Sequence, residues 1–268
     1  MKVMKIFASA GLICAILATS VGCKVTLTPG ASSSETTTTA SESEEPTTES
    51  TTEATTEPTV ETVIYEKGNE LTKYNIFVSN FVEQRLELID VNESPLKDLV
   101  RFAMIYAKRN EPAVIDYEGG FQRVSLENVQ AIIGKFMVYS IKVEDLSDFA
   151  APPKDGTFDY ENEPFYKDGY FYTYAADGEM TSVFAVVDYK EILGDGTYKL
   201  NFSIYELSSE KFAEIDYAIY NEWAKYYSMT PAEAAADPDV SKIGVGVAFM
   251  SEGETSPILI KYGAVFDN

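Results

Sequence analysis

The chain has 268 residues, a net charge of −22 at neutral pH and no histidine. Without histidine, a Ser-His-Asp triad, a Cys-His nucleophile pair and the usual histidine zinc sites are excluded. The acidic balance opposes binding to nucleic acid and to anionic lipid surfaces, because both carry charge of the same sign.

The first 22 residues have the parts of a secretory signal. Lys2 and Lys5 give a positive start, and residues 6–18 form an uncharged, mostly apolar run. This run is shorter than the about 20 apolar residues that span a bilayer. Residues 1–22 are therefore predicted to be a signal peptide. An uncleaved anchor and a plain signal peptide cut elsewhere are the alternatives.

The signal ends in the small-residue box Val21-Gly22-Cys23, with Ser20 where leucine is usual. The box resembles the signal of bacterial lipoproteins. The resemblance implies that Cys23 becomes the first residue and carries acyl chains such as palmitate on its sulfur and its amine. It also implies that the lipid anchors the protein to the cell membrane, which is thereby a binding partner. The rest of the chain would lie outside the cytoplasm.

Residues 23–59 are predicted to be the lipidated cysteine and a disordered tether rich in Ser, Thr and Glu. Residues 31–59 carry seven glutamates and lack aromatic and large aliphatic side chains. Such a segment cannot bury enough apolar area to offset the entropy of ordering its backbone. Repulsion between the glutamates extends it further.

Residues 60–268 are predicted to be a single extracytoplasmic α+β domain. The tether holds seven of the 43 acidic residues, and three of the 21 basic residues precede residue 25, which leaves the domain a net charge of −18. Cys14 lies in the signal and Cys23 is the lipidation site, so the domain has no cysteine. Its stability must then come from its core rather than from disulfides.

Apolar residues at three- and four-residue spacing predict three helices in the first half of the domain. The second is expected to begin with Ser94 as N-cap and Pro95 as first helical residue, and to end at Asn110. The third is expected to begin at Ser125, with Asn128 in the capping-box position. Their predicted buried residues are Leu71, Tyr74, Phe77, Val78 and Phe81, then Leu96, Leu99, Val100, Ala103 and Ala107, then Val129, Ile132, Ile133 and Phe136.

The second half of the domain is rich in strand signals. Asp168-Gly169 predicts a two-residue hairpin between strands at 165–167 and 170–174. Further strands are predicted at 180–189, 197–207, 243–250 and 257–265. The segment 211–227 fits a helix or a strand, and Thr230-Pro231-Ala232-Glu233 is a capping box that opens a short helix.

These elements predict N-terminal helices packed on an antiparallel sheet of about five or six strands. A cone-shaped fold like that of the nuclear transport factor 2 (NTF2) class suits this order. No internal repeat is evident, and the one candidate for a second domain boundary is Ala150-Ala151-Pro152-Pro153.

The candidate binding surface is a row of aromatic residues. Tyr170, Tyr172 and Tyr174 alternate along one predicted strand, so their rings share a face, and Phe165 and Tyr166 lie across the hairpin. An exposed row of this kind can stack on sugars or pack on a partner protein. The alternative is that this face belongs to the core and that the tyrosines reflect β-propensity.

Motifs for catalysis are lacking. Gly244-Val245-Gly246 misses the third glycine of a nucleotide-binding loop, and Ser208 to Lys211 matches a Ser-x-x-Lys motif only in its letters. The acidic segment 155–163 misses the spacing of an EF-hand, so a solvated loop is preferred to a calcium site. No catalytic residue, metal site or cofactor is predicted.

The sequence therefore favours a membrane-anchored surface lipoprotein with a non-catalytic domain that binds an envelope glycan or protein partner. One alternative is a hydrolase of envelope polysaccharide that uses a pair of carboxylates. The other is a structural or sensor lipoprotein.

Overall fold

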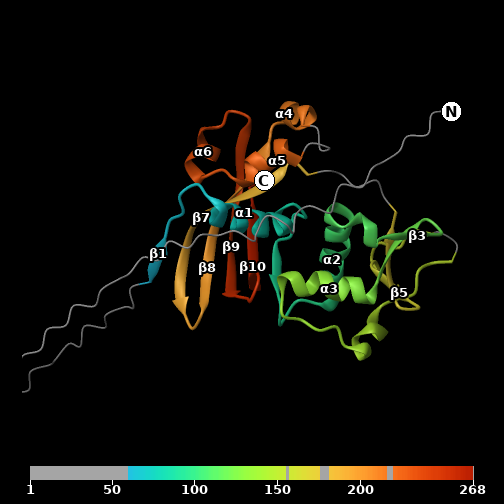
Figure 1. Ribbon diagram of the computed structural model, residues 1–268. Helices are drawn as coiled ribbons and strands as arrows, with labels where there is room; N and C mark the ends of the chain where they lie inside the picture. The colour runs from blue at the N-terminus through green and yellow to red at the C-terminus, as the bar shows by residue number, and fades with distance from the viewer. Residues whose placement is uncertain (1–59, 155–156, 176–180, 216–219, 268) are drawn as a thin grey trace, which may run out of the picture. The chain divides into compact units, whose positions relative to one another are not determined.

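The computed structural model describes residues 60–154, 157–175, 181–215 and 220–267 (Figure 1). These belong to one compact unit, Val60–Asn268. The predicted signal, Cys23 and the tether lie outside the described residues. The unit is α+β, with two antiparallel sheets.

The larger sheet, called here the large sheet, has six antiparallel strands in the order β1-β7-β8-β9-β10-β2. Hairpins join β7 to β8 and β9 to β10, and β8 pairs with β9 along its whole length. The strands are β1 (Glu61–Val63), β7 (Val183–Gly194), β8 (Thr197–Leu207), β9 (Val240–Glu252), β10 (Pro257–Phe266) and β2 (Leu88–Asp90).

The small sheet has four antiparallel strands in the order β3-β4-β6-β5. They are β3 (Asp116–Glu118), β4 (Phe121–Ser125), β6 (Tyr170–Tyr174) and β5 (Phe165–Lys167). The turn between β5 and β6 is the predicted hairpin. Asp168 and Gly169 both have positive φ, at 50° and 86°, as a turn that matches the twist of its strands requires.

The helices are α1 (Asn69–Val82), α2 (Leu96–Asn110), α3 (Leu126–Phe136), α4 (Ser209–Glu214), α5 (Tyr220–Tyr227) and α6 (Pro231–Ala236), with 3₁₀ helices η1 (Pro112–Val114) and η2 (Val143–Asp148). The expected order of N-terminal helices followed by strands is wrong. Strand β1 precedes α1, and β2, β3 and β4 alternate with the next helices, while the small sheet was not expected. Strands β1, β2 and β3 have three residues each, and no Asp-Gly turn like Asp168-Gly169 marks them in the sequence. Among the described residues, no helix is long and apolar enough to cross a membrane.

Helix starts follow local hydrogen bonding. The expectation for Ser94 is wrong: its Oγ accepts from the N–H of Asp90 at 2.8 Å, and Pro95 is the N-cap of α2. Ser125 does cap α3, accepting from the N–H of Asn128 at 3.2 Å. Thr230 forms the expected capping box at α6. The ambiguous segment 211–227 contains parts of α4 and α5.

The large sheet has a hydrophobic core on each face. In β7, Val183, Ala185 and Val187 face the main core with α1, α2 and α3, whereas Phe184 and Val186 face a second cluster with α4, α5 and α6. Figure 1 shows these last three helices gathered at one end of the large sheet. The buried positions predicted for the first three helices are all buried except Leu96, which is half-buried.

A stack of aromatic rings joins the helices to the large sheet. The ring of Phe81 on α1 lies between Phe102 of α2 and Tyr262 of β10, with centroids 4.7 and 5.2 Å away. Phe136 of α3 meets Phe81 edge-on at 5.7 Å. Aromatic pairs of this geometry stabilise a core beyond the area they bury.

Polar side chains of α1 cover part of the outer edge of β7. Strand β1 pairs with Lys190–Ile192, and no described strand borders this side of β7 at residues 185 and 187. The N–H of Ala185 donates instead to Ser79 Oγ at 2.9 Å, and that of Val187 to Asn75 Oδ1 at 2.8 Å. Helix α1 therefore satisfies backbone groups that a strand would otherwise pair.

Candidate functional site

The tyrosine row lies on the small sheet, where β6 pairs with β4 and β5. Tyr170, Tyr172 and Tyr174 share one face, as the alternation predicts. Phe171 points to the other face and belongs to the main core.

The expected exposure of this row is wrong. Phe165, Tyr172 and Tyr174 are buried together with Phe121 in a cluster of their own, called here the aromatic cluster. Tyr170 is half-buried at its margin. Tyr166 is also half-buried, but it packs on Phe171 and the main core, at a ring distance of 4.9 Å. The predicted residues therefore do not form one open surface, since the segment 157–163 lies against the row.

Phe158 and Tyr160 in that segment, called here the aromatic pair, are exposed instead. Each side chain is 64% exposed. Their rings are nearly parallel, with centroids 5.4 Å apart and planes at 10°. Both rings contact Tyr174, at 4.7 Å for Phe158 and 5.4 Å for Tyr160. The pair thus covers the aromatic cluster and presents its own rings to solvent.

Tyr174 fixes the segment that carries the pair. Its hydroxyl donates to the carbonyl of Thr157 at 2.6 Å and accepts from the N–H of Asp159 at 2.7 Å. Its own backbone N–H donates to the Glu163 carboxylate at 3.1 Å. Burial raises the pKa of Glu163, although this hydrogen bond and nearby Arg101 oppose the rise.

Helix α2 holds the same segment from its other side. Lys97 Nζ donates to the carbonyl of Glu161, and Arg101 donates to the carbonyl of Glu163 at 2.9 Å. Within the segment, the side-chain amide of Asn162 donates to the Asp159 carboxylate at 2.8 Å. The backbone that carries the aromatic pair is therefore bonded to both the small sheet and α2.

Arg123 marks the other end of the tyrosine row. Its guanidinium lies 4.5 Å from the centre of the Tyr170 ring. It also pairs with the carboxylates of Glu118 and Asp116. This end of the row is polar and charged, with one arginine beside two carboxylates.

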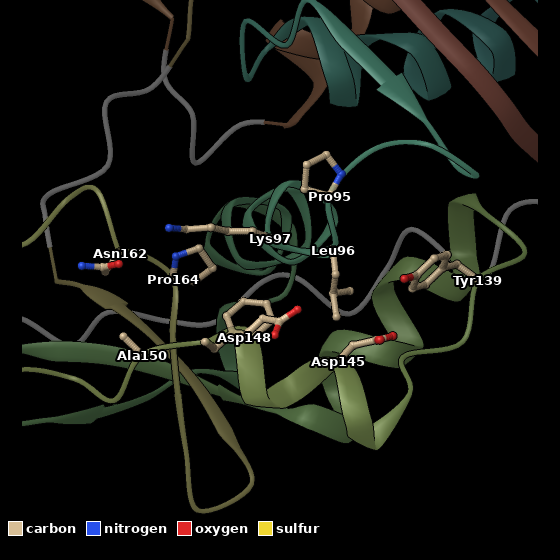
Figure 2. Close-up of a pocket in the computed structure, with 10 residues that line it drawn as sticks. Pro95, Leu96, Lys97, Tyr139, Asp145, Asp148, Ala150, Asn162 and Pro164 are labelled. Atoms are coloured by element: carbon tan, nitrogen blue, oxygen red, sulfur yellow. The ribbon is translucent and has the colours of Figure 1, made fainter.

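A cavity of about 370 Å³ lies among α2, η2 and the segment 162–164 (Figure 2). Apolar lining comes from Pro95, Leu96, Phe149, Ala150 and Pro164, and polar lining from Lys97, Tyr139, Asp145, Asp148 and Asn162. Its volume falls in the range of small-molecule sites, about 300–1,000 Å³. The mixture of apolar and convergent polar groups is also typical of such sites.

The chain matches no protein-family model, no curated protein and no solved structure. Function is therefore inferred from geometry alone. Within the described residues, no group of three acidic or cysteine side chains could hold a metal ion. The predicted lipidation site Cys23 and part of the acidic segment 155–163 lie outside the described residues.

The second face of the large sheet carries a shallow groove of about 540 Å³. Val245 and Val265 line it and are largely exposed. Asp188, at a bulge of β7, also lines it and accepts from Ser203 Oγ at 2.8 Å. Burial raises the pKa of Asp188.

Glu83, just after α1, is a partly buried carboxylate, 12% exposed, that sequence reasoning missed. It accepts from Tyr227 Oη at 2.6 Å, and Trp223 Nε1 donates to the same hydroxyl at 2.5 Å. Burial raises the pKa of Glu83 to about 7, with Tyr227 and Arg109 acting in the opposite direction. Glu83 lines neither the cavity nor the groove, and its partner Tyr227 lies far along the chain, so no local pattern pointed to it.

The aromatic pair was also missed. Its residues fall in a segment that reads as a solvated acidic loop. The available signal was the presence of two aromatics, Phe158 and Tyr160, in an otherwise polar stretch.

Proposed function

We propose that this protein is a lipid-anchored bacterial surface protein whose folded domain binds a glycan of the cell envelope without catalysing a reaction. The observation that carries the proposal is the exposed aromatic pair. Of the described aromatic side chains, only Tyr117, Phe158 and Tyr160 are largely exposed. Two of these three stand together on a segment fixed by hydrogen bonds.

The pair suits a sugar for two reasons. Sugar rings present C–H faces that pack on aromatic faces, and a rigid aromatic surface loses little entropy on binding. The carboxylate of Asp159 and the backbone of the segment offer acceptors for hydroxyl groups beside the rings. A binder needs no pair of carboxylates with separated pKa values, whereas a glycosidase does.

Anchoring at Cys23 is part of the proposal. Each buried acyl CH₂ contributes about 0.8 kcal/mol, so several chains on one residue hold a protein firmly at a membrane. Labelling of cells with a palmitate analogue should mark the wild-type protein and not Cys23→Ser. Equal labelling of both proteins would refute the anchor while leaving the glycan-binding proposal intact.

A finer description of the fold also belongs here. We propose that the large sheet curves as in the cone-shaped NTF2-like class. Bulges bend sheets, and the irregularities between Val187 and Tyr189 and between Leu259 and Lys261 support curvature. The groove on the second face agrees with such a shape. The proposal is tested by measuring the solution scattering curve and comparing it with curves calculated for a curved and for a flat large sheet.

Glycan binding is tested by sedimentation with purified, protein-free cell-wall polysaccharide from the host. The double variant Phe158→Ala/Tyr160→Ala should lose most of the binding. Tyr117→Ala is the matched control, because Tyr117 is 70% exposed but lies on β3 outside the pair. Recovery of the wild type on whole envelopes but not on the purified polysaccharide would indicate a protein partner and overturn the glycan proposal.

A further inference from the structure

We propose that the cavity among α2, η2 and residues 162–164 binds a small zwitterion that carries both an ammonium and a carboxylate, of the amino-acid or short-peptide class. The cavity is lined by charged side chains, whereas the aromatic pair offers two exposed rings. The proposal goes beyond glycan binding and does not depend on it.

One side of the cavity is acidic. Asp145 and Asp148 are three residues apart on η2, and a 3₁₀ helix has about three residues per turn, so both side chains lie on the same side. Both line the cavity, and Tyr139 lies beside them. Burial and the charge of Asp145 raise the pKa of Tyr139, so its hydroxyl stays protonated. This side suits an ammonium group.

The other side is basic. Lys97 lies in the first turn of α2, and its Nζ donates to the Glu161 carbonyl, a neutral acceptor that leaves the ammonium its charge. Among the described residues no side chain caps α2, so the positive end of this 15-residue helix, which also carries Asp98 in its first turn, lies at the same place. Lys97 and the helix end together suit a carboxylate.

In the described part of the chain, no ion pair involves Lys97, Asp145 or Asp148. Burial raises the pKa of nearby Glu163, and the charge of Lys97 acts to lower it without a direct ion pair. Figure 2 shows Lys97 extending towards Asn162 and Pro164, with Asp145 and Tyr139 on the opposite side and Leu96 between them. The apolar surface of Leu96 suits the aliphatic carbon that joins the two charged groups of the ligand.

A ligand of one charge sign fits less well. A simple anion near Lys97 would be repelled by the two aspartates, and a simple cation would pair with the aspartates but leave Lys97 without an opposite charge. A zwitterion oriented along the cavity meets an opposite charge at each end. It therefore gains at both ends without a like-charge contact.

The test uses the full-length protein in detergent and isothermal titration with three probes. Alanyl-alanine carries both charges, N-acetyl-alanyl-alanine only the carboxylate, and alanyl-alaninamide only the ammonium. Free glycine and alanine extend the series. Alanyl-alanine should bind about tenfold more tightly than either blocked probe, a difference of about 1.4 kcal/mol. Equal affinities, or no binding of any zwitterion at millimolar concentration, would overturn the proposal.

Variants locate the site. Lys97→Met should weaken the binding of alanyl-alanine about tenfold and leave that of alanyl-alaninamide nearly unchanged. Asp145→Asn/Asp148→Asn should also weaken the binding of alanyl-alanine about tenfold, but leave that of N-acetyl-alanyl-alanine nearly unchanged. Lys154→Met and Glu144→Gln are controls, since both residues are exposed and neither lines the cavity. Thermal unfolding checks that each variant is folded. Binding that neither cavity variant alters would place the ligand elsewhere and refute the assignment.

Discussion

The side chain of Asn75 accepts a hydrogen bond from the backbone N–H of Val187 at 2.8 Å. Asn75 is fully buried, and its amide nitrogen also donates to the carbonyls of Tyr227 and Met229, at 2.9 and 3.1 Å. One side chain thus connects α1, the edge of β7 and the end of α5. The connection makes the side chain of Asn75 a central contributor to stability.

Replacing Asn75 by alanine should lower the free energy of unfolding by about 3 kcal/mol or more. The change leaves one buried N–H and two carbonyls without their partner, and each such loss costs about 1–3 kcal/mol. Asn80→Ala on the same helix is the control, because within the described residues the Asn80 side chain donates only to the Ile76 carbonyl of its own helix. Urea unfolding of both variants measures the difference. Equal losses for the two would contradict this role of Asn75.

Glu83 should make stability depend on pH. Burial raises its pKa from 4.5 to about 7, so between these values the folded state holds a proton that the unfolded chain releases. The free energy of unfolding from this group therefore falls as the pH rises through that window. The loss is on the order of 2–3 kcal/mol.

Glu83→Gln should remove this dependence and raise stability above pH 7, since glutamine is neutral and still accepts from Tyr227. Chemical denaturation at a series of pH values compares the variant with the wild type. Glu144→Gln on exposed η2 controls for the change in net charge. A variant with an unchanged pH slope would show that Glu83 titrates normally.

Local signals in the sequence predicted much of the second half of the domain. The Asp168-Gly169 turn, the capping box at Thr230 and the bounds of β8 all agree with expectation. In each case the determining groups lie within a few residues of one another. Backbone conformation at a turn and a cap at a helix start need no knowledge of distant contacts.

Features set by distant contacts were not predictable. Strand β4 pairs with β6 about fifty residues later, so the small sheet has no local signature. Asn75 and Ser79 read as ordinary polar residues of a helix, and only the position of β7 explains their burial. Likewise, Tyr172 and Tyr174 are buried because the segment 157–163 lies over them. The sequence showed which residues share a face but not what covers that face.

Gly246 should tolerate no side chain. A Cβ there would overlap the ring of Phe202 and lie 2.8 Å from the carbonyl oxygen of Gly263. Gly246→Ala should therefore cost about 1–3 kcal/mol, as overpacked cores do. Gly134→Ala is the matched control: Gly134 is exposed on α3 with nothing near its Cβ position, and alanine there should stabilise by about 0.5–1 kcal/mol. Thermal unfolding shows whether each variant is less or more stable than the wild type. An unchanged stability of Gly246→Ala would contradict this packing.

Tyr174→Phe should loosen the segment that carries the aromatic pair. The ring contacts remain, but the hydrogen bonds to Thr157 and Asp159 are lost, at a cost of about 1 kcal/mol. Faster amide exchange at Asp159 and weaker glycan binding should follow. Tyr262→Phe is the control, because no described residue bonds its buried hydroxyl, so this change should be neutral or stabilising. Unchanged exchange at Asp159 would show that the segment is held without Tyr174.

The segment from Thr157 to Pro164 supplies residues to two places at once. Phe158 and Tyr160 form the aromatic pair, while Asn162 and Pro164 line the cavity beside α2. A ligand that shifts this segment at the cavity also moves the backbone that carries the aromatic pair, and a ligand at the pair likewise affects the cavity. Such linkage is reciprocal, so a zwitterion that tightens glycan binding by some factor must itself bind more tightly, by the same factor, once the glycan is bound. A short stretch of backbone can in this way make the domain sensitive to two ligands together.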